Sequence, residues 1–495
     1  MTVTYFDVSE MASERDRRRT SGSVDPLSVR REWVGLLLLV AASGVTTIAL
    51  VLVESSQPGP MTAAPLKYGG AFLLLYLTAF FAMRILAPYA DPVILPCVAL
   101  LNGLGLVLIH RLDLAAAAAA ARQGQPIPAG VAGNQMVWTA AGVALFIAVL
   151  ALVRDYRALS RYTYTLAVVG LALILVPAVL PARFSEVNGG KNWILLFGFS
   201  IQPGEFAKVI LLISFASLLV AKRDLFTVAG RHVLGLDLPR ARDLGPLALV
   251  WLVSILVLVF EKNLGFSLLI FGTVLAMLYI ATQRISWVLI GIAFFAVGCW
   301  IAYNLFAHVR VRFDTWRDPF ADYADTGYQL SQSLFGLATG GLFGTGLGQG
   351  SPQMVPFANT DFIISTVGEE LGLFGLAAVL SLYLVIVIRG FRAALTARDS
   401  FGKLLAAGLS FTIAWQMFVV VGGVTALIPL TGLTSPFLSY GGSSLLANFV
   451  LLALLIRISS DSRRPPPSRA PADGEPIADA RTEAVPLRPR RHPRR

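Results

Sequence analysis

Charged residues are scarce in this sequence. Aspartate, glutamate, lysine and arginine together make up 14% of the 495 residues, whereas hydrophobic residues make up 56%. A soluble globular protein usually carries about 25% charged residues, so the composition excludes an ordinary soluble domain. The mean hydropathy of +0.70 indicates instead a chain that lies mostly within a lipid bilayer.

Cysteine and histidine are also rare, and their positions limit the metal and redox chemistry of the protein. The two cysteines, Cys97 and Cys299, both lie in apolar segments, and the four histidines are scattered without an HExxH or CxxC spacing. This pattern gives no basis for a disulfide framework. It also argues against a metal site built from histidine or cysteine ligands.

Long apolar segments are what the sequence has in abundance. Each is about 20 residues long, which matches the hydrocarbon thickness of a bilayer. The first is too long for the hydrophobic region of a signal peptide and predicts a retained signal-anchor helix. We therefore expect an all-α polytopic integral membrane protein with about 12 transmembrane helices, at residues 33–53, 68–87, 92–109, 135–153, 163–182, 204–221, 244–260, 264–282, 285–305, 361–388, 404–427 and 437–458.

The basic residues concentrate in the two tails and in alternate loops. The net charge of +11 therefore follows the positive-inside pattern of membrane proteins rather than a nucleic-acid-binding face. This pattern predicts cytoplasmic termini and places the segments 54–67, 110–134, 183–203 and 306–360 outside. The alanine-rich stretch 114–121 is expected to extend a helix beyond the membrane. The expected domains are a disordered basic tail (1–32), a transmembrane domain (33–458) and a disordered Pro/Arg-rich tail (459–495).

The longest polar interruption is the predicted outer loop 306–360. From residue 311 to residue 375 the sequence contains five aspartates and two adjacent glutamates. Acidic side chains at a membrane boundary are costly and usually functional. Asp361 and Glu369 lie eight residues apart on one predicted helix, or about 12 Å along its axis. Glu369 then lies within the bilayer zone, where it either pairs with a basic residue of a neighbouring helix or serves the site directly.

The segment from residue 183 to residue 208 allows two interpretations. Trp193 suits the membrane interface, and Pro203 with Glu205 suits the first turn of a helix. Glu205 and Lys208 share a helix face and can form an ion pair, which makes this a structural helix start. Alternatively, Lys191 and Lys208 form a cationic cluster that faces an anionic lipid head group.

Two glycine-rich segments need separate interpretations. The string 344–350 resembles a phosphate-binding loop, but it follows no strand and is predicted to lie outside the membrane, so we interpret it as a loop. The segment 431–444 (TGLTSPFLSYGGSS) breaks an apolar region with glycine, proline and hydroxyl residues. Irregular backbone at membrane depth is tolerated where it is buried in protein or lines a water-filled cavity. We therefore expect this segment to mark a pocket, with Ser439 and Ser443 as candidate binding residues.

Four motifs in order along the chain resemble a known family. They are GGKNWI…IQPGEFAK, DPFADYADTGYQLSQS, TDFIISTVGEELGLFG and TGLTSPFLSYGGSS. Together they resemble the SEDS family (shape, elongation, division and sporulation), and within it the actinobacterial RodA/FtsW-like branch. The resemblance covers residues 33–458 and implies a peptidoglycan glycosyltransferase that polymerises lipid II on the outer face of the membrane. It further implies a class B penicillin-binding protein as partner, and a core of ten helices to which two N-terminal helices have been added.

The resemblance also implies which acidic residue is essential. The family's aspartate lies five residues before the glycine of the Gly-Tyr-Gln element, and counting back from Gly327 gives Asp322. Asp318 ranks second, because other members carry Asp or Asn there, and Asp325 is interpreted as a surface substitution. The sequence departs from the family at Gly204, Asn263 and Asn359, where serine, aspartate and histidine are usual. None of these departures removes the Asp322 loop.

The mechanism expected from this resemblance is glycosyl transfer. Asp322, in a partly dehydrated outer cavity, acts as the base that activates a sugar hydroxyl. A divalent cation (Mg or Mn) shares the stabilisation of the pyrophosphate only if a site exists, and the sequence shows no dedicated one. A lipid II flippase is the alternative, since many helices and buried acids also fit a transporter. The candidate substrate-binding residues, including the cations expected to offset pyrophosphate charge, are Lys191, Trp193, Glu205, Lys208, Arg312, Asp318, Asp361, Glu369, Ser439 and Ser443.

Overall fold

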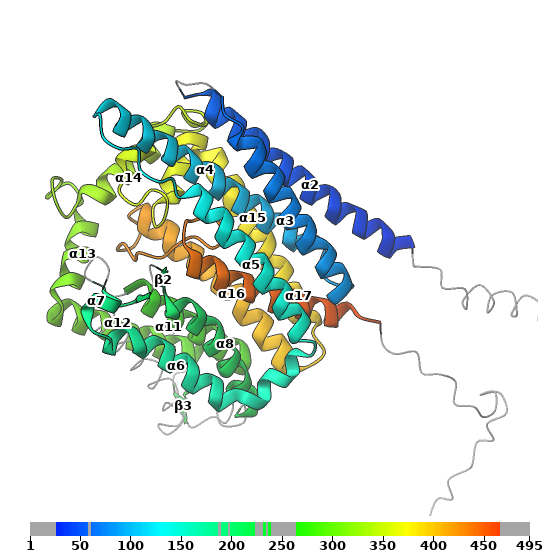
Figure 1. Ribbon diagram of the computed structural model, residues 1–495. Helices are drawn as coiled ribbons and strands as arrows, with labels where there is room; N and C mark the ends of the chain where they lie inside the picture. Colours follow the sequence, from blue (N-terminus) through cyan, green and yellow to red (C-terminus); the bar gives the residue numbers. More distant parts are fainter. Residues whose placement is uncertain are drawn as a thin grey trace, which may run out of the picture.

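The protein is a bundle of long apolar helices (Figure 1). A computed structural model describes residues 26–57, 61–186, 190–196, 199–222, 231–233, 236–238 and 264–465. Within these residues, eleven helices are long and apolar enough to cross a membrane. This confirms the all-α polytopic architecture, to which only two short antiparallel hairpins are added in the described part of the chain.

The helices lie close to the positions that hydrophobicity predicted. The predicted span 244–260 lies outside the described residues. The alanine-rich stretch does extend a helix, because α4 continues to Arg122. The helical elements are α2 (Pro26–Ser55), α3 (Ala64–Leu86), α4 (Ile94–Arg122), α5 (Ala132–Leu152), η1 (Tyr156–Tyr162), α6 (Thr163–Val179), α7 (Ala182–Ser185), α8 (Pro203–Ala221), α11 (Leu264–Thr282), α12 (Ile285–Leu305), α13 (Ala307–Arg317), α14 (Tyr328–Gly340), η3 (Pro352–Met354), α15 (Ile363–Thr396), α16 (Ser400–Val424) and α17 (Gly442–Arg463).

The strands form two hairpins. In the first, β1 (Ile194–Leu196) pairs with β2 (Phe199–Ile201), with Ile194 opposite Ile201. It leads directly into α8, so the segment 183–203 is partly ordered backbone rather than loop. The second pairs β3 (Arg231–Val233) with β4 (Leu236–Leu238).

The ends of the helical domain differ slightly from the predicted boundaries. Helix α2 begins at Pro26, within the segment predicted as the N-terminal tail. Helix α17 continues to Arg463, and Ser459 and Ser460 are buried. The predicted disorder of the remaining tail residues falls outside the described part of the chain.

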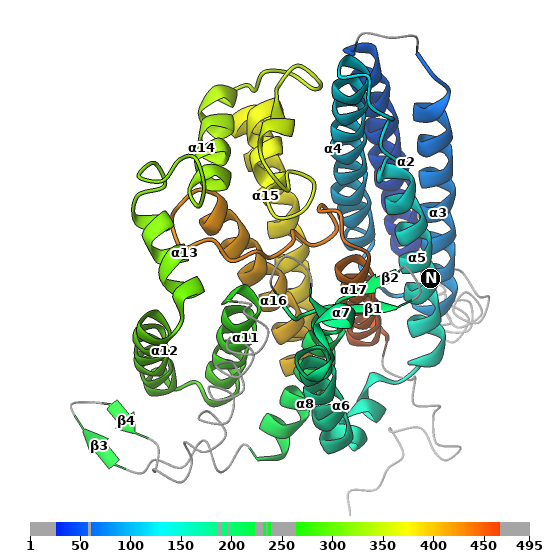
Figure 2. The same ribbon diagram turned by 60° about the vertical axis from the view of Figure 1, so that its left-hand side comes forward.

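The predicted loop 306–360 contains two helices that its polar composition concealed. Helices α13 and α14 connect α12 to α15 along one side of the molecule (Figure 2). Both are shorter than a membrane span, with 11 and 13 residues. Only a few of their side chains are buried, so the apolar run used to find the other helices is missing here.

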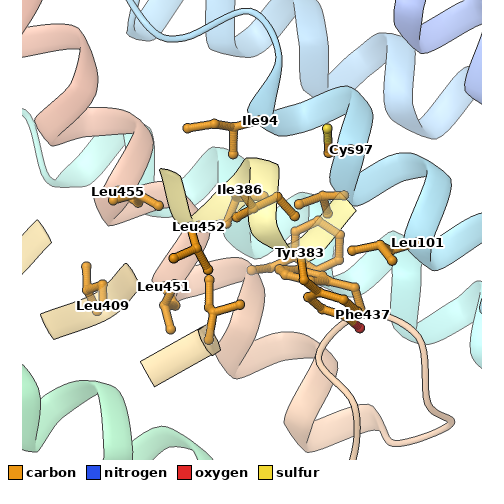
Figure 3. Packing of buried hydrophobic residues seen from close by; sticks show 14 of the residues in the cluster. Ile94, Cys97, Leu101, Tyr383, Ile386, Leu409, Phe437, Leu451, Leu452 and Leu455 are labelled. Carbon is orange, nitrogen blue, oxygen red and sulfur yellow. The ribbon is translucent and has the colours of Figure 1, made fainter. Parts of the chain in front are cut away.

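The core lies where α4, α15, α16 and α17 meet. In α4, 89% of the apolar window is buried, compared with 17% for the segment of η1 and α6. Figure 3 shows Leu101, Tyr383, Phe437 and Leu452 packed together in this core. The Tyr383 hydroxyl donates a hydrogen bond of 2.5 Å to the carbonyl of Pro436. A buried polar atom is thereby satisfied, and the segment before α17 is tied to α15.

Ion pairs join the helices at the end of the bundle where α15 ends and α16 begins. Asp91, which is fully buried, pairs with Arg389 and with Arg463. Arg157 pairs with Asp399 at 3.0 Å and with Asp461 at 2.5 Å. Some of the arginines in the predicted cytoplasmic loops are therefore partnered with carboxylates.

Helix α15 is broken at Gly372, and the glycine-rich segment 341–350, here called the glycine loop, is inserted at the break. Gly372 has a φ of 66°, and a Cβ atom there would lie 2.2 Å from the backbone nitrogen of Gly344. In a regular helix, Leu373 N would donate to Glu369 O. Instead, Glu369 O accepts from Thr345 N at 2.9 Å, and Leu373 N donates to Gly341 O at 2.9 Å.

The next pair of backbone groups is rearranged in the same way. Glu370 O accepts from Gly346 N at 3.0 Å, and Phe374 N donates to Leu342 O at 3.1 Å. The loop backbone therefore supplies partners for both sides of the break, as an interrupted helix within a membrane bundle requires. The glycine string has a structural role in α15.

Replacing Gly372 by alanine should destabilise the protein strongly. The substitution adds a Cβ atom at a positive φ and against the glycine loop, which should cost about 3 kcal/mol or more. The matched control is Gly70→Ala in α3, where an added Cβ atom meets nothing within 4 Å. Thermal unfolding in detergent should show a lowered midpoint for Gly372→Ala alone. Equal midpoints for the two variants would contradict this account of the break.

Candidate functional site

The acidic residues of the predicted loop form a turn between α13 and α14. Asp318 Oδ1 accepts hydrogen bonds from the backbone nitrogens of Phe320 and Ala321, at 3.1 and 3.2 Å. Asp322 Oδ2 accepts from the nitrogen and the hydroxyl of Thr326, at 3.2 and 2.7 Å. Both carboxylates therefore shape the turn, and neither bond to Asp322 uses its Oδ1 atom.

The surroundings of Asp322 differ from the expected partly dehydrated cavity. Its side chain is exposed, as are those of Asp318 and Asp325. That part of the expectation is wrong, because the turn projects from the ends of two short helices instead of folding into the bundle. An exposed carboxylate is open to a substrate that arrives from solution or from the membrane surface.

Asp322 and Gly327 lie at the two ends of a turn that is closed by a backbone hydrogen bond. Gly327 N donates to Asp322 O at 3.0 Å. A Cβ atom at Gly327 would lie 2.0 Å from the carbonyl oxygen of Pro319. Glycine is therefore required where the turn closes, and this closure holds Asp322 at a set distance along the chain from α14.

Helices α13 and α14 are fastened to the segment that follows α16. Arg312 Nη1 donates to Leu430 O at 2.9 Å, Trp316 Nε1 donates to Ala426 O at 2.9 Å, and Ser333 Oγ donates to Val424 O at 3.2 Å. Three side chains thus bond to backbone carbonyls at the end of a transmembrane helix. This explains how a polar excursion of more than fifty residues is held against the bundle.

Arg312 and Asp361 form an electrostatic pair. Asp361 lies in the turn before α15, two residues ahead of its first residue, and not on the helix as predicted. Burial raises the pKa of Asp361 to about 6, and the charge of Arg312 opposes this rise. Burial also lowers the pKa of Arg312, an effect that Asp361 opposes. The two charges therefore attract each other between α13 and the turn before α15.

Ser439 and Ser443 lie in the segment 431–444, where a pocket was predicted. Ser439 Oγ donates to Thr360 O at 2.6 Å and accepts from Ser435 N at 2.9 Å. Ser443 Oγ accepts from Gln202 N at 2.9 Å. Both hydroxyls join the segment to other parts of the chain, and most of the segment is buried in protein. The irregular backbone of this segment is therefore tolerated because it is buried in protein.

Glu205 and Lys208 form the ion pair that their spacing predicted. Lys208 Nζ lies 2.7 Å from Glu205 Oε2, and both residues are 2% exposed. Lys208 also donates to Gln416 Oε1 at 3.2 Å, and Gln416 Nε2 donates to Thr434 O at 2.8 Å. The structure thus favours the structural interpretation for Lys208, because a buried and paired ammonium cannot face a lipid head group.

Lys191 and Trp193 lie apart from that ion pair, before β1. Both side chains are half-buried. Trp193 N donates to Ser185 O at 3.3 Å, which holds the approach to the hairpin against α7. Of the two lysines in the proposed cationic cluster, Lys191 is the one with an accessible side chain.

The two adjacent glutamates of α15 have different partners. Glu370 forms a buried ion pair with Arg111 of α4 at 3.1 Å, so the basic partner expected for Glu369 belongs to its neighbour. Glu369 Oε1 accepts from the backbone nitrogen of Ser351 at 2.6 Å. The only sequence signal for the ion pair of Glu370 was that a second glutamate lies next to Glu369. Arg111 could not be identified as its partner, because it is far away in the sequence.

Glu369 also lines a cavity of about 330 Å³ between α14, the glycine loop and α15. The sequence singled out neither the cavity nor its other polar residues. The side chains of Gln332, Thr339, Gln349 and Ser351 lie around it. The separate hydroxyl and amide residues between Gln332 and Ser351 give no pattern that a sequence motif could reveal.

The acids of the described residues do not form a metal site. No group of three or more His, Cys, Asp or Glu side chains is placed to hold an ion within the described ranges. In Asp318 and in Asp322, one carboxylate oxygen accepts hydrogen bonds from backbone N–H groups. The described residues therefore supply no cluster of three or more ligands for a divalent cation.

Comparison with known proteins places these features in context. Residues 92–464 match the family model of the FtsW/RodA/SpoVE cell cycle proteins. Two of the eleven candidate spans in the described residues, α2 and α3, precede that region. They are the two helices that were predicted as additions to the family core.

Relatives named as enzymes match most of the chain. The peptidoglycan glycosyltransferase RodA of Mycobacterium tuberculosis (strain ATCC 25618 / H37Rv) is 56% identical over 460 residues, covering 93% of this chain and 97% of that protein. The probable peptidoglycan glycosyltransferase FtsW of Geobacter sp. (strain M18) is 33% identical over 312 residues, covering 62% of this chain and 82% of that protein.

A solved structure has the same fold. It is a chain from a study of the structural coordination of polymerization and crosslinking by a peptidoglycan synthase complex. The TM-score is 0.50 at 24% sequence identity, and the match covers 80% of this chain and 97% of that chain.

Asp361 should make stability depend on pH. Its folded-state pKa of about 6 lies above the ordinary value of 3.8, so the protonated form is the one that folding favours. The stabilisation is complete below the ordinary pKa and is lost as the pH rises through about 6. Asp361→Asn should remove this decline between about pH 4 and pH 7.

The measurement is the thermal midpoint of each variant across that pH range. Asp314→Asn serves as the matched control, since Asp314 is an exposed carboxylate on α13. It should keep the pH slope of the unmodified protein. A slope that is unchanged in Asp361→Asn would show that another group is responsible.

Proposed function

The chain belongs to the FtsW/RodA/SpoVE family, and from this membership we propose that it is a peptidoglycan glycosyltransferase that polymerises lipid II into glycan strands. The identity of 56% to a RodA glycosyltransferase over nearly the whole chain supports the reaction class. The lower identity of 33% to an FtsW protein favours a RodA-like role in cell elongation over one in division. The alternative of a lipid II flippase has no feature of its own in the described residues that favours it.

The orientation of the site follows from charge and topology. The basic segments 154–161 and 389–403 lie at one end of the bundle, where Arg157 pairs with Asp399 just before α16. The Asp322 turn follows α13, which is bonded through Arg312 to Leu430 beyond the opposite end of α16. The positive-inside rule places the basic end in the cytoplasm. Both termini are then cytoplasmic, and Asp322 faces the outside, where the disaccharide of lipid II is presented.

Asp322 is proposed as the general base. The carboxylate Oδ1 takes the proton from the 4-hydroxyl of one lipid II as that oxygen attacks the anomeric carbon of the other sugar. The bond between this carbon and the lipid pyrophosphate breaks, and the pyrophosphate leaves with the bonding electron pair. The observation that supports this role is the exposed carboxylate, held only through Oδ2 by Thr326. Binding of the substrate would supply the dehydration that the free turn lacks.

Cationic residues would offset charge on the departing pyrophosphate. Lys191 and Arg312 are the candidates with side chains that are not fully buried. Lys208 is excluded from direct contact by its burial beside Glu205. Arg312 is held at Leu430 O, so its place relative to the bundle is already set before substrate binds.

A class B penicillin-binding protein is the proposed partner. The solved chain of similar fold comes from a complex that couples polymerization to crosslinking. A partner that crosslinks the new strands would need to work on the same face as Asp322. Assays of purified protein should therefore be run with and without such a co-purified partner.

Asp322→Ala should lower the rate of lipid II polymerisation by about 10² to 10⁴, the usual contribution of a general base. Asp325→Ala is the matched control, because Asp325 lies exposed in the same turn and its side chain is assigned no role. Gel analysis of the glycan product measures both rates, and equal thermal midpoints exclude misfolding. Polymer formation by Asp322→Ala at the unmodified rate would rule out Asp322 as the base.

A further inference from the structure

We propose that the cavity beside Glu369 binds a neutral saccharide portion of the glycan substrate or product. The cavity of about 330 Å³ lies between α14, the glycine loop and α15. Its size falls in the range of small-molecule binding sites, which begins at about 300 Å³. The inference rests on the proposed glycosyl transfer and assigns a second contact region to it.

The cavity has an exposed rim and a buried floor. Phe335, Thr339 and Gln349 are exposed at the rim, whereas Glu369 is 4% exposed at the floor. Two glycines, which have no side chains, leave open space around the carboxylate of Glu369. A Cβ atom at Gly336 would lie 3.0 Å from Glu369 Oε2, and one at Gly350 would lie 3.0 Å from Glu369 Oε1.

The carboxylate of Glu369 is held in place but not neutralised by a cation. Its Oε1 atom accepts from Ser351 N at 2.6 Å, and Arg111 of α4 forms its ion pair with the neighbouring Glu370. A buried carboxylate gains most from further hydrogen-bond donors. The described cavity lining therefore favours a ligand that brings donors of its own.

The residues that line the cavity favour the saccharide part of a lipid-linked sugar over its pyrophosphate part. Its polar side chains are amides, hydroxyls and one carboxylate, with no lysine or arginine among the described lining residues. A pyrophosphate would meet an acid without a compensating cation, which is unfavourable. Sugar hydroxyls and an N-acetyl N–H can donate to Glu369 and exchange hydrogen bonds with the amides and hydroxyls. Neutral saccharide is the class that fits.

The cavity is connected to the turn that holds Asp322. Gln332, which lines the cavity, donates through Nε2 to the Tyr323 hydroxyl at 2.7 Å. The rings of Phe320 and Tyr323 pack on Phe335 at centroid distances of 5.7 and 6.2 Å. The residues on each side of Asp322 thus contact the wall of the cavity. A sugar chain reacting at Asp322 would have this cavity as its neighbouring surface.

The test measures binding of chitotetraose, a soluble neutral oligosaccharide of N-acetylglucosamine, to the purified full-length protein in detergent. Saturation-transfer NMR titration gives the dissociation constant without any need for turnover. Thr339→Trp places a large side chain at the rim and should weaken binding at least about tenfold, since it fills the cavity. Glu369→Gln should weaken binding about tenfold or more through loss of a charged acceptor.

The matched control is Thr78→Trp. Thr78 and Thr339 are both exposed on helices, and each donates its hydroxyl to the carbonyl four residues earlier at 2.8 Å. Thr78 lies on α3, away from the cavity lining, so its replacement should leave binding unchanged. Because Thr339 is exposed, Thr339→Trp still tests the cavity if the buried substitution Glu369→Gln impairs folding.

Two results would overturn the inference. One is the absence of saturation transfer to chitotetraose by the unmodified protein at millimolar concentration. The other is binding that Thr339→Trp and Glu369→Gln leave as strong as in Thr78→Trp. In both cases the cavity is a solvent-filled packing gap. The proposed function fails separately, in the polymerisation assay, when the unmodified protein makes no glycan or Asp322→Ala makes it at full rate.

Discussion

A break in a membrane helix leaves backbone groups without partners, and the segments around Glu369 are arranged to supply them. At Gly372, α15 loses two of its own hydrogen bonds, and the glycine loop provides a donor or an acceptor for each of the four groups involved. Because an unpaired backbone group in a membrane bundle costs several kcal/mol, the loop and the helix have to fold together. The break also lets Glu369 face the cavity while Glu370 reaches Arg111.

The acidic residues of this part of the protein are distinguished by what surrounds them. Glu370 and Glu205 are buried and paired with cations; the first pair joins α15 to α4, and the second lies within α8. Asp361, in the turn before α15, is attracted electrostatically by Arg312 of α13. Asp322 is exposed, as are Asp318 and Asp325 of the same turn, and the family resemblance ranks it first among them. Glu369, buried and bonded to one backbone nitrogen, borders open space. Pairing, rather than acidity, therefore separates structural carboxylates from candidate reactive ones.

Sequence reasoning succeeded where local properties dominate. Apolar length located the described membrane helices, and an i,i+3 spacing identified the pair of Glu205 and Lys208. It failed for α13 and α14, whose short helices carry few buried residues. Nor did the sequence reveal how residues 431–444 are packed. That segment is bonded to residues 202 and 360 through Ser443 and Ser439, and the cavity lined by Glu369 lies beside α14.

The sequence by itself determined the number and placement of most helices and the family resemblance, and that resemblance singled out Asp322 as the candidate base through its spacing from Gly327. Each of these depends on residues close together in the chain, where helix length, turn closure and side-chain size act directly. Only the tertiary structure decided which carboxylates have partners. Arg111 of α4 pairs with Glu370 of α15, and such pairings depend on how helices pack, which no local pattern encodes. The same packing exposes Asp322, buries Lys208 and opens the cavity at Glu369.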